Sequence, residues 1–210
     1  MRHSSVLDNK SLFAASRDLF WISGHPTLVH TPAVLLKQTE DGNLRLKGDY
    51  GEESEQTVVE VPAPGVPVHP SSLLMSADLM SLGEFSEAAM LHTVRTRYLD
   101  GEDLYTQIGS AILLSVNPMR PRNELYSVKV AKGFQQESER QRLGGNTSQE
   151  DPSPHLFKLA EDAYRSLLAS KKNQEIIISG ISGSGKTMAT RLMIAYLANA
   201  GGGFKSLEQL

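Results

Sequence analysis

Short apolar stretches separated by turn residues occupy the first third of the chain. They are residues 19–22, 31–36, 44–46 and 57–61, with glycine, proline, aspartate or asparagine between them. This pattern predicts short strands joined by turns, and Asp41-Gly42 predicts a hairpin between the second and third strands. We therefore expect a small β-barrel over residues 18–61, preceded by a flexible lead-in over residues 1–17.

A proline-rich stretch, residues 62–75, follows the predicted barrel and predicts a stiff, extended connector. From residue 76 the spacing of apolar positions lengthens, so residues 76–210 are expected to form a second, larger domain. Ser86 is expected to cap a helix that runs to about residue 98. Its apolar face would contain Leu91, Val94 and Tyr98.

Three further elements are predicted in this second domain. Residues 110–116 form a continuous apolar run that ends at Asn117-Pro118, as is typical of a strand buried on both faces. Residues 133–151 are polar and predict a surface loop. Ser153 and Pro154 predict the start of a helix, whose apolar stripe is expected to pack on a sheet. That stripe contains Leu156, Leu159, Ala160, Ala163, Tyr164 and Leu167.

The composition narrows the classes of function. The 210 residues carry a formal net charge of −3, with 40% hydrophobic residues and no cysteine. Basic residues are not in excess, so no nucleic-acid partner is expected, and a disulfide framework or cysteine nucleophile is excluded. The apolar runs are far shorter than the roughly 20 residues of a membrane span. We expect a cytoplasmic protein without a transmembrane segment, and the six scattered histidines predict no metal site.

One motif carries recognisable chemistry. Residues 174–179 predict a β-branched strand that leads directly into GISGSGKT, and a helical apolar pattern follows. Strand, G-x-x-x-x-G-K-[ST] and helix together are typical of a phosphate-binding loop (P-loop). A glycine-rich turn with an incidental lysine is the alternative, and the flanking strand and helix disfavour it.

Each residue type in the P-loop has a physical reason. Glycines at 180, 183 and 185 permit backbone conformations in which N–H groups point at phosphate oxygens, and the helix N-terminus favours negative charge. The predicted phosphate-binding residues are Gly180, Ile181, Ser182, Gly183, Ser184, Gly185, Lys186 and Thr187. Lys186 is expected to reach the β- and γ-phosphates, and Thr187 to ligate Mg²⁺.

Hydrolysis needs more than this loop. An acidic residue must hold Mg²⁺ and another group must position the attacking water. Among the residues that follow Thr187 only Glu208 is acidic, and it is not in a strand pattern. No catalytic residue is therefore predicted, and the chain alone is expected to hold ATP without hydrolysing it.

Several ordered blocks of residues 76–209 resemble the start of the myosin motor domain. They are LHTVRTRY (91–98), LYTQIG (104–109), ILLSVNP (112–118), residues 154–164, the P-loop and residues 207–209. The resemblance implies an α/β P-loop NTPase fold, myosin motor-like and incomplete, preceded by the small β-barrel. The remaining strands of the motor's sheet and both of its switch regions would lie beyond Leu210.

The resemblance also implies site residues and partners. Asn117, Pro118, Arg120 and Tyr126 would frame the adenine, and the P-loop would hold the phosphates of ATP and Mg²⁺. The intact parent would bind actin filaments in the cytoplasmic actin cytoskeleton, with a light chain or calmodulin-type partner. This chain departs from the family at Ile181 and Met188, where glutamate is usual, and its 117–126 loop is one residue longer.

Three functional hypotheses follow. The first is the ATP-binding portion of an actin-based Mg-ATPase motor. The second is a nucleotide-binding or regulatory remnant of a motor without turnover. The third, an unrelated P-loop kinase or ATPase, is disfavoured by the match around Asn117-Pro118.

Overall fold

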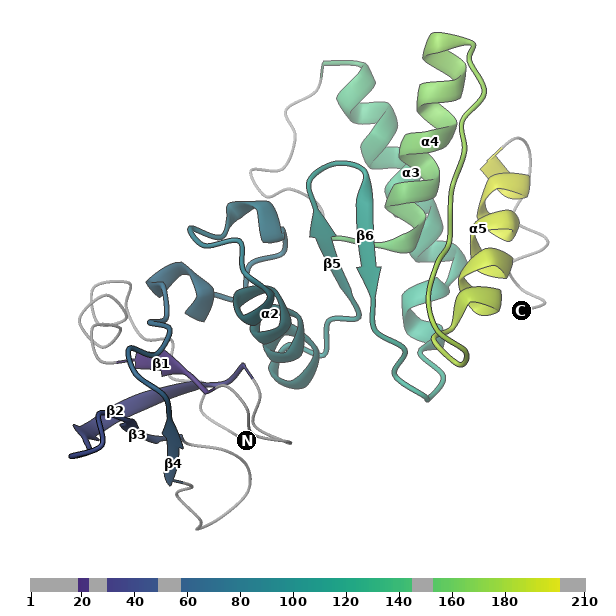
Figure 1. The fold of residues 1–210 in the computed structure, drawn as a ribbon. Coiled ribbons are helices and arrows are strands. Elements are labelled where there is room, and N and C mark those ends of the chain that lie inside the picture. Colours follow the sequence, from purple (N-terminus) through teal and green to yellow (C-terminus); the bar gives the residue numbers. More distant parts are fainter. Residues whose placement is uncertain (1–18, 23–29, 49–57, 145–152, 201–210) are drawn as a thin grey trace. The chain divides into compact units, whose positions relative to one another are not determined.

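The computed structural model describes residues 19–22, 30–48, 58–144 and 153–200. The chain divides into two compact units, Met1–Glu102 and Asp103–Leu210, and each is described by itself (Figure 1). The predicted lead-in over residues 1–17 lies outside the described residues. No helix in the described ranges is long and apolar enough to cross a bilayer.

The first unit contains a four-stranded antiparallel sheet in the order β1-β2-β3-β4. Its strands are β1 (Leu19–Trp21), β2 (Pro32–Gln38), β3 (Leu44–Lys47) and β4 (Val58–Val61). All four predicted strands are therefore confirmed. The predicted hairpin joins β2 to β3, and Gly42 adopts a φ of +83° in its turn. In the part of the chain described, β1 and β4 do not pair with each other, so closure into a barrel stays a prediction.

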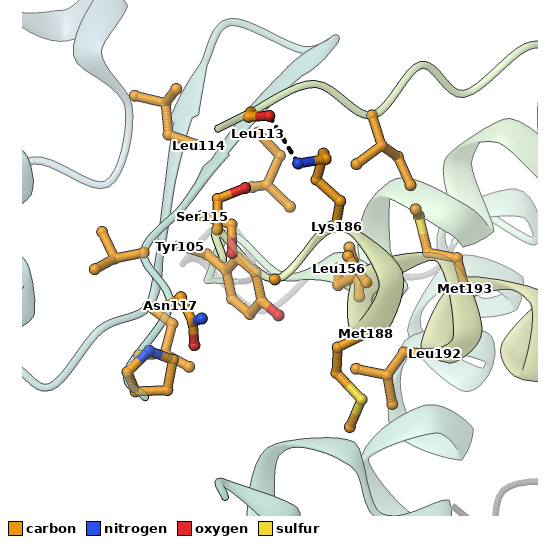
Figure 2. Close-up of a pocket in the computed structure, with 18 of the residues that line it drawn as sticks. Tyr105, Leu113, Leu114, Ser115, Asn117, Leu156, Lys186, Met188, Leu192 and Met193 are labelled. Atoms are coloured by element: carbon orange, nitrogen blue, oxygen red, sulfur yellow. Dashed lines mark hydrogen bonds between the residues drawn. The ribbon is translucent and has the colours of Figure 1, made fainter. Parts of the chain in front are cut away.

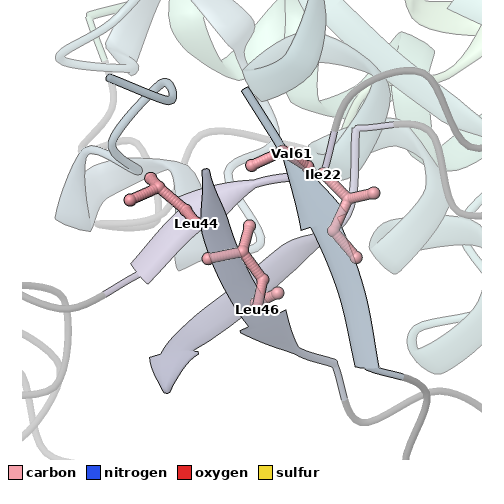
Figure 3. Packing of buried hydrophobic residues seen from close by; sticks show 5 residues of the cluster. Ile22, Leu44, Leu46 and Val61 are labelled. Atoms are coloured by element: carbon pink, nitrogen blue, oxygen red, sulfur yellow. The ribbon is translucent and has the colours of Figure 1, made fainter. Parts of the chain in front are cut away.

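Alternation along the strands builds the core of this unit. Leu44 and Leu46 point to one face of β3 and are buried, as the period of two residues requires. They pack with Ile22, Ala33 and Val61 (Figure 3). The stretch predicted as a connector lies along the sheet, because the Trp21 N–H donates to the Val66 carbonyl at 2.8 Å and the Val68 N–H donates to the Leu19 carbonyl at 2.9 Å.

Helix α2 (Glu87–Asp100) follows two short 3-10 helices, η2 (Pro70–Leu73) and η3 (Leu79–Ser81). The predicted cap is confirmed, since the Ser86 hydroxyl accepts a hydrogen bond from the Ala89 N–H at 3.2 Å. The predicted apolar face is wrong: Leu91 is 40% exposed, and Ala89, Thr93 and Arg97 are buried. Small side chains allow α2 to approach η2 closely, and Arg97 donates to the Met75 carbonyl at 3.4 Å.

The only tryptophan of the chain contacts a histidine of α2. The rings of Trp21 and His92 meet edge to face with centroids 5.5 Å apart. His92 Nδ1 is buried and has no hydrogen-bond partner in the described part of the chain. Burial, with the nearby charge of Arg95, lowers the pKa of His92 to about 4. The unfolded chain therefore binds a proton at His92 more readily than the folded unit does.

We expect the stability of the first unit to fall as the pH falls from about 6.5 to about 4, by about 3 kcal/mol from His92. Above pH 6.5 the histidine is neutral in both states and contributes no pH dependence. Urea unfolding followed by Trp21 fluorescence measures this. His92→Phe keeps the ring contact and lacks the titrating nitrogen, so its unfolding should show a weaker pH dependence in this window. An unchanged slope would show that other groups dominate.

The second unit begins with a hairpin of β5 (Tyr105–Ile108) and β6 (Ile112–Ser115). The 3-10 helix η4 (Asn123–Tyr126) and helices α3 (Val128–Arg142), α4 (Leu156–Ser170) and α5 (Lys186–Ala200) follow. The predicted strand at 110–116 is confirmed as β6, but its burial on both faces is wrong. Ile112 is 54% exposed, because in the described residues β6 pairs only with β5.

Helix α3 corrects the loop predicted over residues 133–151. The helix reaches Arg142, and residues 145–152 lie outside the described part. The Ser127 hydroxyl caps it by accepting from the Val130 N–H. Its polar residues are good helix formers, and Glu139 pairs with Arg142 at 2.6 Å across one turn. Polarity alone therefore did not distinguish an exposed helix from a loop.

Helix α4 begins two residues after the predicted proline. Its N-cap is His155, whose Nδ1 accepts from the Phe157 N–H at 3.0 Å, so the predicted start at Ser153-Pro154 is wrong. Leu156 and Ala160 of the predicted stripe are buried. The helix packs against α3 and α5 (Figure 1), and its Leu159 borders a small pocket together with Gln107 and Leu113 of the β5–β6 hairpin.

The segment before the P-loop is not a strand in this structure. Residues 174–179 carry no strand assignment and pair with no described strand, and Ile177 is 87% exposed. A β-strand needs a neighbouring backbone to accept and donate its hydrogen bonds. The predicted strand is therefore wrong for the chain as it stands.

Candidate nucleotide-binding site

The P-loop connects this segment to α5 and has the backbone conformations expected of it. Gly180, Gly183 and Gly185 adopt φ values of +156°, +79° and +93°. A Cβ atom at Gly180 would lie 2.5 Å from the Ser184 hydroxyl oxygen, which is closer than real Cβ contacts come. The Ser184 N–H donates to the Ile181 carbonyl at 3.3 Å and so closes the turn.

Lys186 is the first residue of α5, and its side chain reaches back over the loop (Figure 2). Its Nζ donates to the Gly180 carbonyl at 2.8 Å and to the Ile181 carbonyl at 2.7 Å. Among the described residues this ammonium forms no ion pair with a carboxylate, so it is available to an anion that enters the loop. Thr187 follows in the first turn of α5 and is exposed, so its hydroxyl is accessible.

The residues after β6 form the other wall of the site. Asn117 donates from Nδ2 to the Gly183 carbonyl at 2.7 Å, which joins two segments 66 residues apart in sequence. Pro118 and Arg120 follow in the same loop, and Tyr126 ends η4. The structure therefore brings the two predicted groups of binding residues together.

A cavity of about 930 Å³ lies between these walls. Its volume is within the range of small-molecule sites. The predicted residues that line it are Asn117, Pro118, Arg120, Tyr126, Gly180, Ile181, Ser184, Gly185 and Lys186. Ser182, Gly183 and Thr187 are not part of the lining. In Figure 2 Asn117 and Tyr105 lie toward the hairpin, and Met188, Leu192 and Met193 lie on α5.

Tyr105 lines the cavity, although no local pattern in the sequence predicted a binding role for it. Its hydroxyl lies 2.7 Å from the hydroxyl of Tyr126, and the two form a hydrogen bond. Burial and this hydrogen bond raise the pKa of Tyr105 well above its usual range, so the phenol stays protonated. Only the contact across 21 residues identifies it, because its position in β5 is that of an ordinary core tyrosine.

An aromatic cluster supports Tyr126 from behind. His155 stacks on Phe134 with centroids 5.0 Å apart and contacts Tyr126 at 5.9 Å. Burial lowers the pKa of His155 to about 4, so its ring is neutral at physiological pH. The wall at Tyr126 is therefore backed by packed, uncharged rings.

A buried carboxylate anchors the helix that carries Lys186. Glu161 of α4 is 2% exposed and accepts from the Tyr196 hydroxyl of α5 at 2.9 Å and from Arg165 Nε at 2.6 Å. Arg165 also donates to Glu139 of α3 at 3.1 Å. The Phe157 and Tyr196 rings stack beside this pair at 4.8 Å. The network ties α5 to both other helices of the unit.

The loop, lysine and helix N-terminus match the pattern of phosphate-binding loops. Comparison with known families gives a more specific result. The family model described as "Myosin head (motor domain)" matches residues 76–209, and the chain belongs to this family.

Individual relatives agree with this membership. Unconventional myosin-Vb of Mus musculus is 32% identical over 192 residues, which cover 87% of this chain and 10% of the relative. The high molecular weight form of myosin-1 of Acanthamoeba castellanii is 31% identical over 200 residues, 95% of this chain and 12% of the relative. Myosin-M heavy chain of Dictyostelium discoideum is 37% identical over 123 residues, which cover 59% of this chain and 6% of the relative. The chain thus spans about a tenth of the length of these relatives.

Proposed function

We propose that this chain is the ATP-binding portion of a myosin-type motor and that it holds Mg-ATP in the 930 Å³ cavity. One observation carries the proposal: the P-loop and the Asn117-Pro118 loop, far apart in sequence, meet at a single cavity through the Asn117–Gly183 hydrogen bond. The phosphates would lie at the P-loop, and the base between Pro118, Arg120 and Tyr126.

The charge of the cavity fits this ligand. Its described lining includes Arg120, Arg122 and Lys186 and contains no carboxylate. A triphosphate is attracted by such a surface, by the N-terminal end of α5 and by the inward N–H groups of the loop. Thr187 would supply a hydroxyl ligand to Mg²⁺, which neutralises charge on the phosphates when it is bound.

The residues that line the cavity also indicate whether this chain can hydrolyse ATP. Phosphoryl transfer requires an acidic residue for the metal and a group that positions water, and no acidic residue lines the cavity among the described residues. We infer that the 210-residue chain binds ATP without sustained hydrolysis. The hypothesis of a nucleotide-binding or regulatory remnant without turnover predicts the same behaviour for this chain.

The activity of a whole parent is a proposal based on family membership. An intact motor of this family would be an Mg-ATPase that moves on actin filaments in the cytoplasm, with a light chain or calmodulin-type partner. The family match disfavours an unrelated P-loop kinase or ATPase.

Titration of the 210-residue chain with a fluorescent ATP analogue, with and without Mg²⁺, tests the proposal. We expect Mg²⁺ to tighten binding by roughly tenfold, a change of about 1.4 kcal/mol. Thr187→Ala should reduce this effect to below about twofold, because the hydroxyl ligand is lost, and Thr187→Ser should retain it. Binding that is independent of Mg²⁺ in the unsubstituted chain, or repeated phosphate release, would contradict the proposal.

A further inference from the structure

The side-chain amide of Asn117 forms hydrogen bonds with other residues of the protein, Gly183 and Met119. Its Nδ2 donates to the Gly183 carbonyl at 2.7 Å and to the Met119 sulfur at 3.2 Å. Its Oδ1 accepts from the Met119 N–H at 3.0 Å. An asparagine amide has two N–H donors and one oxygen, so both donors are engaged and neither is left for a purine base.

The bond to Gly183 determines which way a P-loop peptide faces. The peptide between Gly183 and Ser184 is trans, so its carbonyl and its N–H point in opposite directions. Asn117 binds this carbonyl from the loop that follows β6. The Ser184 N–H therefore points into the loop, where it donates to the Ile181 carbonyl at 3.3 Å. This distance is beyond the usual range for an N–H···O bond, so a phosphate oxygen can replace the carbonyl at little cost.

Gly183 has no side chain that could hold this orientation. A Cβ atom at Gly183 would meet no atom within 4 Å in the described structure, and glycine at φ +79° is conformationally free. At Gly185 the nearest atoms to such a Cβ belong to Asn117, at 3.7 Å. The Asn117 side chain thus lies against two of the three glycines of the loop, Gly183 and Gly185.

We infer that Asn117 is a positioning residue for the phosphate-binding loop: it orients the Gly183–Ser184 peptide so that an N–H faces the phosphates, and it does not read the base. The inference rests on the proposed nucleotide binding and deepens it. It replaces the adenine contact that the family resemblance implied for Asn117. Replacing Asn117 should therefore weaken the binding of every ligand that carries the polyphosphate, whatever base is attached.

Calorimetric titration of the 210-residue chain with ATP, inorganic tripolyphosphate and adenosine tests this role. Asn117→Leu keeps the side-chain size and removes the hydrogen bonds. We expect this variant to bind ATP and tripolyphosphate more weakly by the same factor, about tenfold. This is the effect of losing one hydrogen bond in a charged site. Adenosine binding should stay within twofold. Asn117→Gln restores a donor and should recover part of the lost affinity.

Two controls separate this role from general damage. Lys172→Ala changes an exposed residue of the same unit that does not line the cavity, so the affinities for ATP and for tripolyphosphate should both stay unchanged. Tyr126→Phe alters the wall predicted to hold the base and should leave tripolyphosphate binding within twofold. Thermal melts establish that each variant is folded. If Asn117→Leu fails to fold, Asn117→Ser is measured by the same criteria.

The outcomes are distinct. Weaker ATP binding by Asn117→Leu with unchanged tripolyphosphate binding would make Asn117 a base contact and overturn the inference, while the proposed function would stand. Unchanged affinity for both ligands would overturn it as well. If the unsubstituted chain bound neither ATP nor tripolyphosphate, the proposed function itself would fail.

Discussion

Replacing Lys186 by alanine is expected to weaken ATP binding by the 210-residue chain by about a hundredfold or more. The Lys186 ammonium contacts two backbone carbonyls of the loop, at 2.8 and 2.7 Å, and faces the space that the phosphates would occupy. Hydrogen bonds to charged groups contribute about 1.5–3 kcal/mol each, and a mobile point charge makes more than one with a polyphosphate. Alanine removes these contacts without changing the helix propensity unfavourably.

The same titration on Lys172→Ala provides the matched control. Lys172 is an exposed lysine of the same unit, so its replacement changes the net charge equally. We expect its ATP affinity to stay within twofold of the unsubstituted chain, since exposed charges are screened by salt. Lys186→Arg should bind weakly, because the guanidinium is larger and planar. An affinity of Lys186→Ala within threefold of the unsubstituted chain would show that the nucleotide is bound elsewhere.

Replacing Glu161 by alanine is expected to lower the free energy of unfolding of the second unit by about 3 kcal/mol. The substitution removes the acceptor of both the Tyr196 hydroxyl and Arg165 Nε. Glu161 is buried, and breaking a buried pair leaves polar groups without partners at a cost of roughly 3–5 kcal/mol. The Arg165 side chain is 31% exposed, so water reaches its guanidinium and the lower end of that range applies.

Asp162→Ala is the adjacent control for this prediction. Asp162 forms an exposed i,i+4 pair with Lys158 at 2.7 Å, and its side chain is 50% exposed. Such pairs contribute about 0.3–0.5 kcal/mol, so this variant should unfold within about 0.5 kcal/mol of the unsubstituted chain. Glu161→Gln should be intermediate, because its amide oxygen still accepts from Tyr196. Urea unfolding followed by circular dichroism gives all three values. A loss below about 1 kcal/mol for Glu161→Ala would mean that the network is not a stabilising anchor.

Elements with strong local signals were predictable from sequence. The four strands of the first sheet, the turn at Asp41-Gly42 and the cap at Ser86 were all predicted and observed. Each depends on a few neighbouring residues: alternation of apolar positions, a glycine that accepts a positive φ, or a hydroxyl near a helix N-terminus.

Elements that depend on distant partners were not. The face of α2 that is buried was decided by its packing against η2. Residues 174–179 have the composition of a strand, yet no described strand pairs with them. The N-cap of α4 was decided at His155, whose ring fits among Tyr105, Phe134 and Phe157.

The candidate site likewise has a part that the sequence predicts and a part that only the structure shows. By itself the sequence determined the phosphate side, because a P-loop is a contiguous run whose glycines, Lys186 and Thr187 act within one turn between an extended segment and a helix. Only the tertiary structure decided that Asn117 bonds to Gly183 and that Tyr105 bonds to Tyr126. These contacts join residues 66 and 21 positions apart, and such pairings depend on how the whole unit packs, which no local pattern encodes.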